Sequence, residues 1–361
     1  MNVREFFFDL PAGLIAQEPP PVRGTSRLLH LNRQTGARTH TTIDRLADFL
    51  EKGDLVVVNN TRVFPARLLG HRVPSGGAVE CLLVSPTAFV ASGVSRTPAT
   101  DETWQALMHP GQKLAPGARV IFEGAGGPAL QGEVLERHFH GRRTIRLWTE
   151  DGRAVQDVVD AIGHMPLPPY IKRGDRADDR ERYQTVYARE RGSIAAPTAG
   201  LHFTPAAFAS LKARGVDVAE VTLHVGYGTF QPVRVERVED HTLEAERYEI
   251  TQETADAIER ARASGRRVVA VGTTTTRTLE AVARANGGRV VAGTGATDLF
   301  IYPGFVFQAV KGLLTNFHLP ASSLVMLVAA FGGQTAVMQA YADAIAEGYR
   351  FYSYGDAMLI T

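Results

Sequence analysis

The chain contains a single cysteine and almost no net charge. The first fact bears on its redox compartment, and the second limits how it could bind a nucleic acid. Cys81 alone cannot form an internal disulfide, which fits a reducing compartment, and the strand-like run 79–84 around it predicts a buried thiol. The formal net charge is only +1, so a nucleic-acid partner has to be met by a local basic patch. No apolar run reaches the roughly 20 residues of a membrane helix, and residues 1–5 carry charge instead of a signal-like apolar stretch. We therefore expect a cytoplasmic protein without a membrane partner.

The common signatures of metal, phosphate and nucleophile sites are also missing. The 11 histidines are scattered without H-E-x-x-H or Cys/His ligand spacing, so no metal site is expected. Residues 272–277 lack the Lys of a Walker A loop, and no Gly-x-Ser-x-Gly elbow is present. No G-x-G-x-x-G follows a first strand, which argues against a Rossmann dinucleotide site.

Two different patterns of predicted secondary structure divide the chain. Residues 63–155 hold short strand-like runs separated by Gly and Pro without a convincing helix, which is typical of a small β-barrel. Residues 1–62 and 156–361 alternate strands with helices, which indicates an α/β core. The predicted fold class is therefore α/β, with a barrel-like α/β main domain and a small all-β barrel domain inserted in it. Helices are expected over 42–53, 204–214, 251–265, from the turn at 272 to 286, from 320, and over 334–347, and strands over 54–60, 221–224, 268–271, 313–315 and 349–354.

The segment 194–206, IAAPTAGLHFTPA, is the most informative part of the chain. Small residues and a Gly allow its backbone to approach a ligand or a neighbouring segment closely. His202, two Thr hydroxyls and a Phe ring lie in the same short stretch. Thr204-Pro205 is a helix start, with Thr as N-cap and Pro at the first helical position. This mixture favours a pocket for a polar ligand.

Two other loops, 224–230 and 315–320, repeat the mixture of Gly, His, Thr and Asn, which predicts one site assembled from several segments. His202, His224 and His318 are the candidate catalytic residues, because each lies in such a loop. The alternative for each is a structural histidine.

Two further segments are candidate anion sites. Thr273, Thr274 and Arg277 open a helix after a strand, where backbone N–H groups and hydroxyls bind a carboxylate or phosphate. The alternative is an elaborate N-cap with a surface Arg. Residues 59–62 end a strand with two amides, a hydroxyl and a guanidinium, at the edge where α/β sheets bind ligands, unless they form only a domain-boundary turn.

Basic residues alternate with aromatic ones at 137–143 and again at 349–352. Cations and exposed rings suit RNA, whose phosphates and unstacked bases they contact. The alternative is a pair of ordinary strand faces.

Several long stretches match one family in order along almost the whole chain. They include DLVVVNNTRVFPA (54–66), GHMPLPPY (163–170), AAPTAGLHF (195–203), TLHVGYGTFQPV (222–233), FIYPGF (300–305) and YRFYSYGDAMLI (349–360). The chain resembles the S-adenosylmethionine:tRNA ribosyltransferase-isomerases of queuosine biosynthesis. It departs from their pattern at Glu244, where members often carry a second His after the one that matches His241.

The resemblance implies transfer and isomerisation of the ribosyl part of S-adenosylmethionine. The acceptor is 7-aminomethyl-7-deazaguanine at the wobble position of a tRNA with a GUN-type anticodon, and the products are epoxyqueuosine-tRNA, adenine and methionine. S-adenosylmethionine is a substrate here, so no cofactor is expected, and we expect a monomer.

This chemistry needs a base for the ribose C5′ proton, a donor for departing adenine and a site for the methionine carboxylate. We assign the base to His202 or His318. Residues 273–277 are expected to hold an anion, either the methionine carboxylate or an RNA phosphate, and Asp356 is expected to accept from the amino group of the deazaguanine. The expected binding residues are Asn59, Asn60, Arg62, Thr198, Gly200, Gly226, Gly228, Thr273, Thr274, Arg277, Asn316 and Asp356.

Three other functions remain open at this point. They are a transferase acting on a free nucleoside, a catalytically silent RNA-binding module and a methyltransferase. Adenine release that depends on precursor tRNA separates the first two from the expected function, and release of S-adenosylhomocysteine would mark the third.

Overall fold

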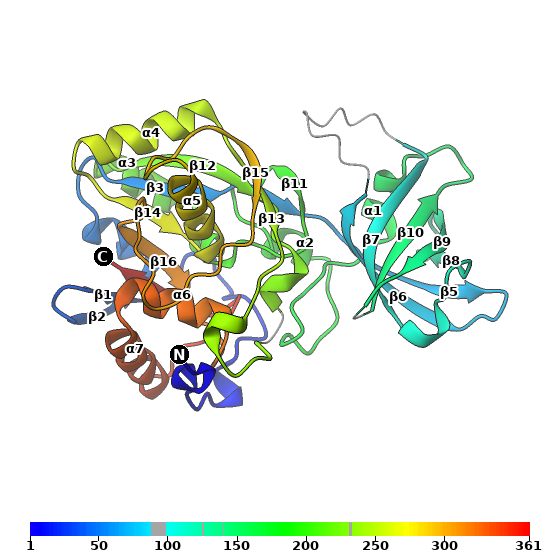
Figure 1. The fold of residues 1–361 in the computed structure, drawn as a ribbon, viewed down its shortest axis with the longest axis horizontal. Coiled ribbons are helices and arrows are strands. Elements are labelled where there is room, and N and C mark those ends of the chain that lie inside the picture. Colours follow the sequence, from blue (N-terminus) through cyan, green and yellow to red (C-terminus); the bar gives the residue numbers. More distant parts are fainter. Residues whose placement is uncertain (88–98, 125, 140, 231–232) are drawn as a thin grey trace. The chain divides into compact units, whose positions relative to one another are not determined.

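The computed structural model describes residues 1–87, 99–124, 126–139, 141–230 and 233–361, and the chain divides into two compact units (Figure 1). The first unit contains Met1–Arg62, Pro168–Arg173 and Glu181–Thr361, and the second contains Val63–Leu167 and Gly174–Arg180. The sequence placed the return to the larger unit at 156. The structure keeps the chain in the second unit to Leu167, because helix α1 (Val155–Ile162) packs on strand β9 (Ala129–Arg137) and the His164 backbone pairs with Arg67.

The first unit is built on a nine-stranded mixed sheet in the order β15-β13-β12-β3-β14-β16-β17-β1-β2. Its strands are β1 (Arg27–Leu31), β2 (Arg38–Thr42), β3 (Leu55–Asn59), β12 (Asp217–Leu223), β13 (Glu246–Ile250), β14 (Val268–Val271), β15 (Gly293–Thr297), β16 (Gly312–Asn316) and β17 (Ala357–Ile360). The central strands β12, β3, β14 and β16 are parallel, and antiparallel pairs such as β1–β2 and β13–β15 extend both sides. The α/β class with an inserted β-barrel is confirmed. The large sheet is open, with edges at β15 and β2, in place of the expected barrel-like closure.

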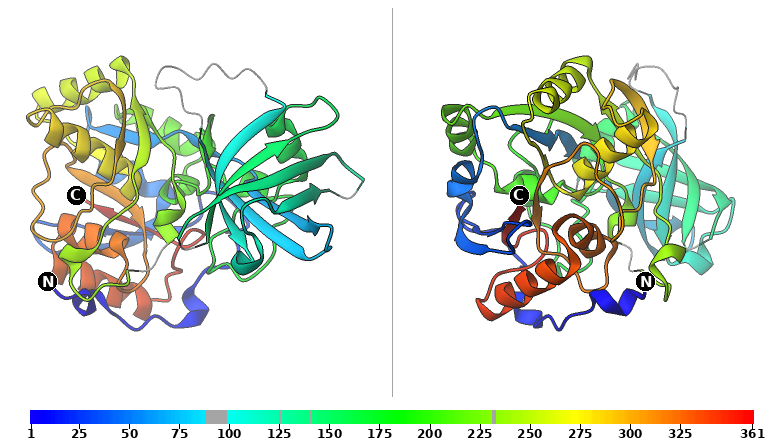
Figure 2. Two further views of the ribbon diagram at one scale, coloured as in Figure 1. Left: turned by 45° about the vertical axis from the view of Figure 1, so that its right-hand side comes forward. Right: turned by 60° about the vertical axis from the view of Figure 1, so that its left-hand side comes forward.

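Strands β3, β14 and β16 are buried along their whole length because helices and loops cover both faces of the sheet there. Val57, Ala270 and Leu313 face a core shared with helices α4 (Gln252–Ala263), α5 (Thr273–Ala285), α6 (Ser323–Gly332) and α7 (Gln334–Ala346). Their strand neighbours Val58 and Leu314 face a second core with helix α3 (Pro205–Ala213). Figure 2 shows α4 to α7, in yellow to red, gathered on one side of the sheet.

The second unit contains a closed antiparallel barrel in the order β10-β7-β6-β5-β8-β9. Besides β9 its strands are β5 (Arg67–Val73), β6 (Ala78–Pro86), β7 (Asp101–His109), β8 (Arg119–Glu123) and β10 (Arg142–Trp148). The expected all-β unit is thus confirmed. Cys81 is fully buried inside the barrel as predicted, and burial raises the pKa of its thiol, so the thiol is inert.

The remaining elements are short. They are α2 (Asp179–Arg182), the paired strands β4 (Thr61–Val63) and β11 (Glu190–Ser193), and the 3₁₀ helices Val3–Phe6, Ala12–Leu14, Ile43–Phe49, Gly111–Lys113, Thr198–His202, Tyr227–Phe230 and Val238–Asp240. The helix expected over 42–53 is therefore a 3₁₀ helix. No single helix of the described chain has the length and apolarity of a membrane span; α6 and α7 meet that test only jointly, bent by 115°.

The predicted strand at 349–354 is wrong. The segment is a turn in which Tyr352 has a positive φ of 74°, and the strand β17 starts only at Ala357. The Asp356 carboxylate fixes the turn by accepting the backbone N–H groups of Arg27 and Arg350 at 2.9 and 2.7 Å. An extended strand over 349–354 would move Arg350 too far from Asp356 for this hydrogen bond.

Candidate active site

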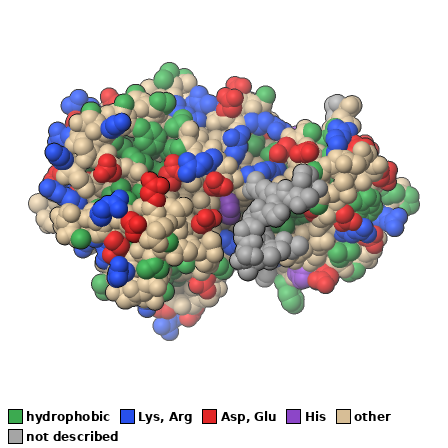
Figure 3. Space-filling model, turned by 90° about the horizontal axis from the view of Figure 1, so that it is seen from above, with side chains coloured by type: hydrophobic (Ala, Val, Ile, Leu, Met, Phe, Trp, Pro, Cys, Tyr) green, Lys and Arg blue, Asp and Glu red, His purple; other side chains and the backbone are tan. Residues whose placement is uncertain are grey.

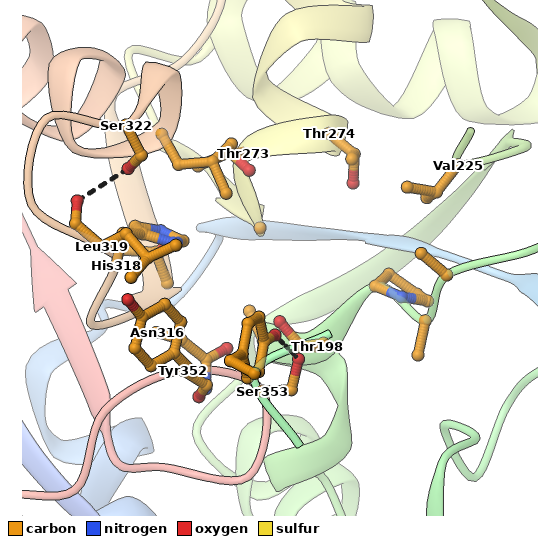
Figure 4. A pocket seen from close by; sticks show the side chains of 18 of the residues that line it. Thr198, Val225, Thr273, Thr274, Asn316, His318, Leu319, Ser322, Tyr352 and Ser353 are labelled. Atoms are coloured by element: carbon orange, nitrogen blue, oxygen red, sulfur yellow. Dashed lines mark hydrogen bonds between the residues drawn. The ribbon is translucent and has the colours of Figure 1, made fainter. Parts of the chain in front are cut away.

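A cavity of about 460 Å³ lies beside the carboxyl ends of β14 and β16. Ligands of α/β sheets bind at such strand ends, and the volume is in the range of about 300–1,000 Å³ typical of small-molecule sites. Its lining comes mainly from 195–199, 272–274, 315–322 and 352–353, and none of the described lining residues is charged. Figure 4 shows Thr273 and Thr274 on one side of the pocket and Tyr352 and Ser353 on the other. Two of the three predicted loops therefore converge, while 224–230 contributes only Val225.

His318 presents its imidazole ring to this cavity. Its Nε2 lies 2.7 Å from the Thr315 hydroxyl, and its backbone N–H donates to the hydroxyl of Tyr341 at 3.1 Å. No described residue hydrogen-bonds its Nδ1. Burial lowers the pKa of His318 to about 3, so the ring is neutral near pH 7. A neutral imidazole with one nitrogen anchored and the other facing a cavity can act as a base or as a hydrogen-bond donor.

His202 lies behind the cavity wall and contacts Asn316. The Asn316 amide donates to the Tyr352 carbonyl at 3.0 Å and to His202 Nε2 at 3.1 Å. The reverse orientation of this amide would place two oxygens against each other, so Nε2 accepts and the ring proton sits on Nδ1, 3.0 Å from the Ser26 hydroxyl. Burial, and then the charges of Arg23 and Arg350, lower the pKa of His202 to about 4. His202 is therefore a neutral residue that orients Asn316.

Asn316 and Tyr352 are lining residues of the cavity, and each has one polar atom that lacks a partner among the described residues. Asn316 Oδ1 and the Tyr352 hydroxyl are both buried without a hydrogen bond. Burial and then the neighbouring Tyr170 and Tyr341 raise the pKa of Tyr352, so its hydroxyl stays protonated. The ring stacks on Tyr170 at 4.4 Å between centroids, and a positive φ of this kind in a non-glycine residue is often found at functional sites. Tyr170 was not among the predicted site residues, and Tyr352 was singled out only as part of the basic and aromatic segment 349–352, although both lie in family-matching stretches.

The N-terminus of α5 opens onto the same cavity. Gly272 precedes it with φ of 90°, a conformation that glycine adopts readily, and no side chain caps the helix. The hydroxyls of Thr273 and Thr274, each 6% exposed, line the cavity and bond to no described residue. Their counterparts Thr275 and Thr276 instead donate to backbone carbonyls of the preceding turn. Free N–H groups and hydroxyls at a helix N-terminus favour an anion.

Arg277 lies elsewhere. Its guanidinium donates to Glu246 at 2.6 Å in a pair whose side chains are each 6% exposed, and also to the carbonyls of Leu299 and Thr297. Glu246 in turn accepts the backbone N–H of Gly226 at 2.9 Å. The structure thus uses Arg277 to hold β13 and a loop together, away from the cavity lining.

The strand-end residues Asn59 and Asn60 also make internal contacts. Asn59 exchanges two hydrogen bonds with the Leu223 backbone, and Asn60 bonds to Glu220 and Thr222. Arg62 is exposed. None of the three lines the 460 Å³ cavity.

His224 belongs to a separate small cluster. Its Nδ1 is 2.9 Å from the Thr61 hydroxyl, which also contacts Ser193 at 2.7 Å. His241 packs edge-on against Phe300 at 5.0 Å. Neither His224, His241 nor Glu244 is among the residues lining the cavity.

Of the remaining expected binding residues only Thr198 lines the cavity. Gly200 is a packing position, since an added Cβ would lie 2.1 Å from the Tyr187 hydroxyl. Gly226 and Gly228 lie near Glu246 and Glu244, respectively. The Asp356 carboxylate already accepts two backbone N–H groups in the turn at 349–356 and does not line the cavity. No group of three metal-ligating side chains occurs within the described ranges.

The two basic and aromatic segments differ. Tyr349, Phe351 and Tyr352 are buried core residues, so the RNA-binding interpretation of 349–352 is wrong. In 137–143 the Phe139 ring is 87% exposed, while His140 lies outside the described residues.

Residues 3–360 match the family model described as queuosine biosynthesis protein. The chain is 48% identical over 360 residues to the S-adenosylmethionine:tRNA ribosyltransferase-isomerase of Desulfitobacterium hafniense, with 100% of both chains covered. It is 50% identical over 362 residues to the protein of that name from Nitratidesulfovibrio vulgaris, covering 98% of this chain and 95% of that one. The crystal structure of S-adenosylmethionine tRNA ribosyltransferase from Thermotoga maritima matches with 36% identity and a TM-score of 0.54, over 99% of this chain and 100% of that one. The chain therefore belongs to the queuosine biosynthesis protein family and is an enzyme of the transferase and isomerase class.

Proposed function

We propose that this enzyme transfers the ribosyl part of S-adenosylmethionine to 7-aminomethyl-7-deazaguanine at the wobble position of a tRNA with a GUN-type anticodon. Isomerisation then gives epoxyqueuosine-tRNA with release of adenine and methionine. The observation that carries the proposal is the uncharged 460 Å³ cavity, which joins a free imidazole nitrogen to an open helix N-terminus. The names of the relatives support it. We further propose that the enzyme works as a cytoplasmic monomer, with S-adenosylmethionine as a substrate and no cofactor.

The N-terminus of α5 is the proposed site of the methionine carboxylate. The carboxylate would accept the free N–H groups of the first turn and the hydroxyls of Thr273 and Thr274. Since Arg277 is paired with Glu246, the helix end alone supplies the positive potential.

His318 is the proposed base for the C5′ proton beside the sulfonium. In the tautomer where Nε2–H donates to Thr315, the Nδ1 lone pair faces the cavity and can take that proton. The electron pair stays on C5′ next to the positive sulfur, which stabilises it. Burial keeps the lone pair free, because it holds the pKa of His318 near 3. It also makes the imidazole a weaker base, so the acidity of the C5′ proton has to supply much of the driving force.

His202 is proposed to act through Asn316. Its accepting Nε2 fixes the amide so that Oδ1 is the atom left for a ligand N–H donor. His202 touches no cavity ligand itself and is a positioning residue.

The test follows every product of one incubation. The purified enzyme is mixed with S-adenosylmethionine and tRNA carrying the aminomethyl-deazaguanine, and adenine, methionine and the nucleoside mass are measured by chromatography. Equal release of both small molecules with the mass of epoxyqueuosine supports the proposal. Turnover of the free nucleoside at the same rate would support a transferase that acts on free nucleosides. Release of S-adenosylhomocysteine would support a methyltransferase, and binding without turnover would support a catalytically silent RNA-binding module.

A further inference from the structure

The β9–β10 hairpin of the barrel carries an aromatic side chain that the fold leaves uncovered. Phe139 in its turn is 87% exposed, more than Val306 at 76% or Phe7 at 62%. A singly exposed apolar side chain is common on protein surfaces, so a function for Phe139 has to be argued from the groups around it.

Hydrogen bonds fasten this hairpin, close to its turn, to the loop 111–114. Arg143 is buried at 1% exposure and donates to the carbonyls of Leu114, Arg142 and Gly111 at 2.9, 2.6 and 2.5 Å. These bonds hold the turn 111–114 against the hairpin. Lys113 therefore lies on a loop that is tied to the same end of the barrel as Phe139.

Two cations of this unit, Arg137 on the hairpin and Lys113 on the turn 111–114, are exposed and uncommitted. Arg67, Arg146 and Arg153 each pair with a carboxylate, from Glu80, Asp101 and Asp151. Arg137 and Lys113 are exposed, and neither has an ion pair or hydrogen bond to a described side chain. The nearby carboxylate of Glu136 contacts His138 and Thr144 instead.

We propose that Lys113, Arg137 and Phe139, the hairpin patch, bind the tRNA substrate outside the reacting nucleotide. Phe139 stacks on an unpaired base, and the two cations contact phosphates, the combination with which proteins hold single-stranded RNA segments. The formal net charge of the chain is only +1, so RNA binding would need a local patch of cations, and on the face drawn in Figure 3 Lys and Arg are interspersed with Asp and Glu. This inference rests on the proposed tRNA substrate.

The test compares Phe139→Ala with Phe7→Ala, an exposed phenylalanine of the other unit. Phe139→Ala is expected to raise the KM for precursor tRNA about 10-fold, with kcat and the KM for S-adenosylmethionine unchanged, and Phe139→Trp is expected to restore it. Arg137→Gln is expected to reduce the slope of log affinity against log salt by about 1, whereas Arg153→Gln, which removes a paired cation, leaves it unchanged.

Binding of a fluorescently labelled, unmodified tRNA transcript keeps this proposal separate from the function. If turnover is absent while Phe139→Ala weakens transcript binding, the ribosyl transfer is wrong and the patch stands. If Phe139→Ala and Phe7→Ala give the same KM and the same transcript affinity, the patch is overturned.

Discussion

His202 Nε2 accepts a hydrogen bond from the Asn316 side chain at 3.1 Å, although only Asn316 of the two lines the cavity. His202, which lies in the segment 194–206, thus contacts the cavity only through Asn316. His318, three residues after Thr315 on the loop that follows β16, is the imidazole that faces a ligand.

This relationship predicts that His202 and Asn316 act as one unit. His202→Ala and Asn316→Ala are each expected to lower kcat for adenine release about 10-fold, and the double variant is expected to lose no more than either one, because both changes remove the same oriented Oδ1. Rates at saturating substrates for the three variants measure the coupling. Losses that multiply would show that the two residues act independently.

The N-terminus of α5 predicts a selective loss of affinity. Thr274→Val removes a hydroxyl that faces the cavity while keeping the shape, and we expect binding of S-adenosylmethionine to weaken about 5-fold, the worth of about one hydrogen bond. Thr276→Val is the matched control, since that hydroxyl donates to the Gly272 carbonyl inside the helix. Calorimetric titration measures both. Equal affinities for the two variants would contradict the carboxylate site.

The ion pair between Arg277 and Glu246 predicts a loss of stability. Arg277→Met removes the guanidinium that pairs with the buried Glu246 carboxylate and is expected to reduce the free energy of unfolding by about 3 kcal/mol. Adding Glu246→Gln removes that charge and keeps an acceptor for the Gly226 N–H, so part of the loss should return. Urea unfolding measures both variants. An unchanged stability combined with weaker binding of S-adenosylmethionine would instead make Arg277 a ligand residue.

The two buried histidines predict a fall in stability on mild acidification. The pKa values of His202 and His318 are held at about 4 and 3 in the folded chain, against about 6.5 when unfolded, so between pH 6.5 and 4 the unfolded chain binds more protons. Their contribution is complete above pH 6.5 and is lost as the pH falls. Each should cost about 2 kcal/mol between pH 7 and 5. His202→Gln cannot titrate, and its unfolding free energy should fall by that much less; an identical fall in both proteins would refute the assignment.

Local patterns predicted a large part of this fold. The run Val268–Val271, the turn at Gly272 and the helix after it follow from a buried strand and a glycine at positive φ. The barrel strands alternate apolar and polar residues, and their closure is confirmed. By contrast, β2 and β15 are short and mostly polar, and they become strands only because a neighbouring strand offers its edge.

The site was predictable only where its chemistry is local. The hydroxyls of Thr273 and Thr274 follow from a helix start, and they do line the cavity. Arg277 looked like their partner, but a carboxylate 31 residues away in sequence takes its guanidinium. The aromatic run at 349–352 looked like a strand, because nothing local announces that the Asp356 carboxylate will close it into a turn.

The most direct test of the central claim is adenine release by the wild-type enzyme and by His318→Ala, side by side, with S-adenosylmethionine and precursor tRNA at saturation. We expect the wild type to release adenine only when the tRNA carries the aminomethyl-deazaguanine. His318→Ala should release it at least about 100-fold more slowly, the usual contribution of a general base, while its affinity for S-adenosylmethionine changes less than about 3-fold. Full-rate release by His318→Ala, or release by the wild type without precursor tRNA, would contradict the account.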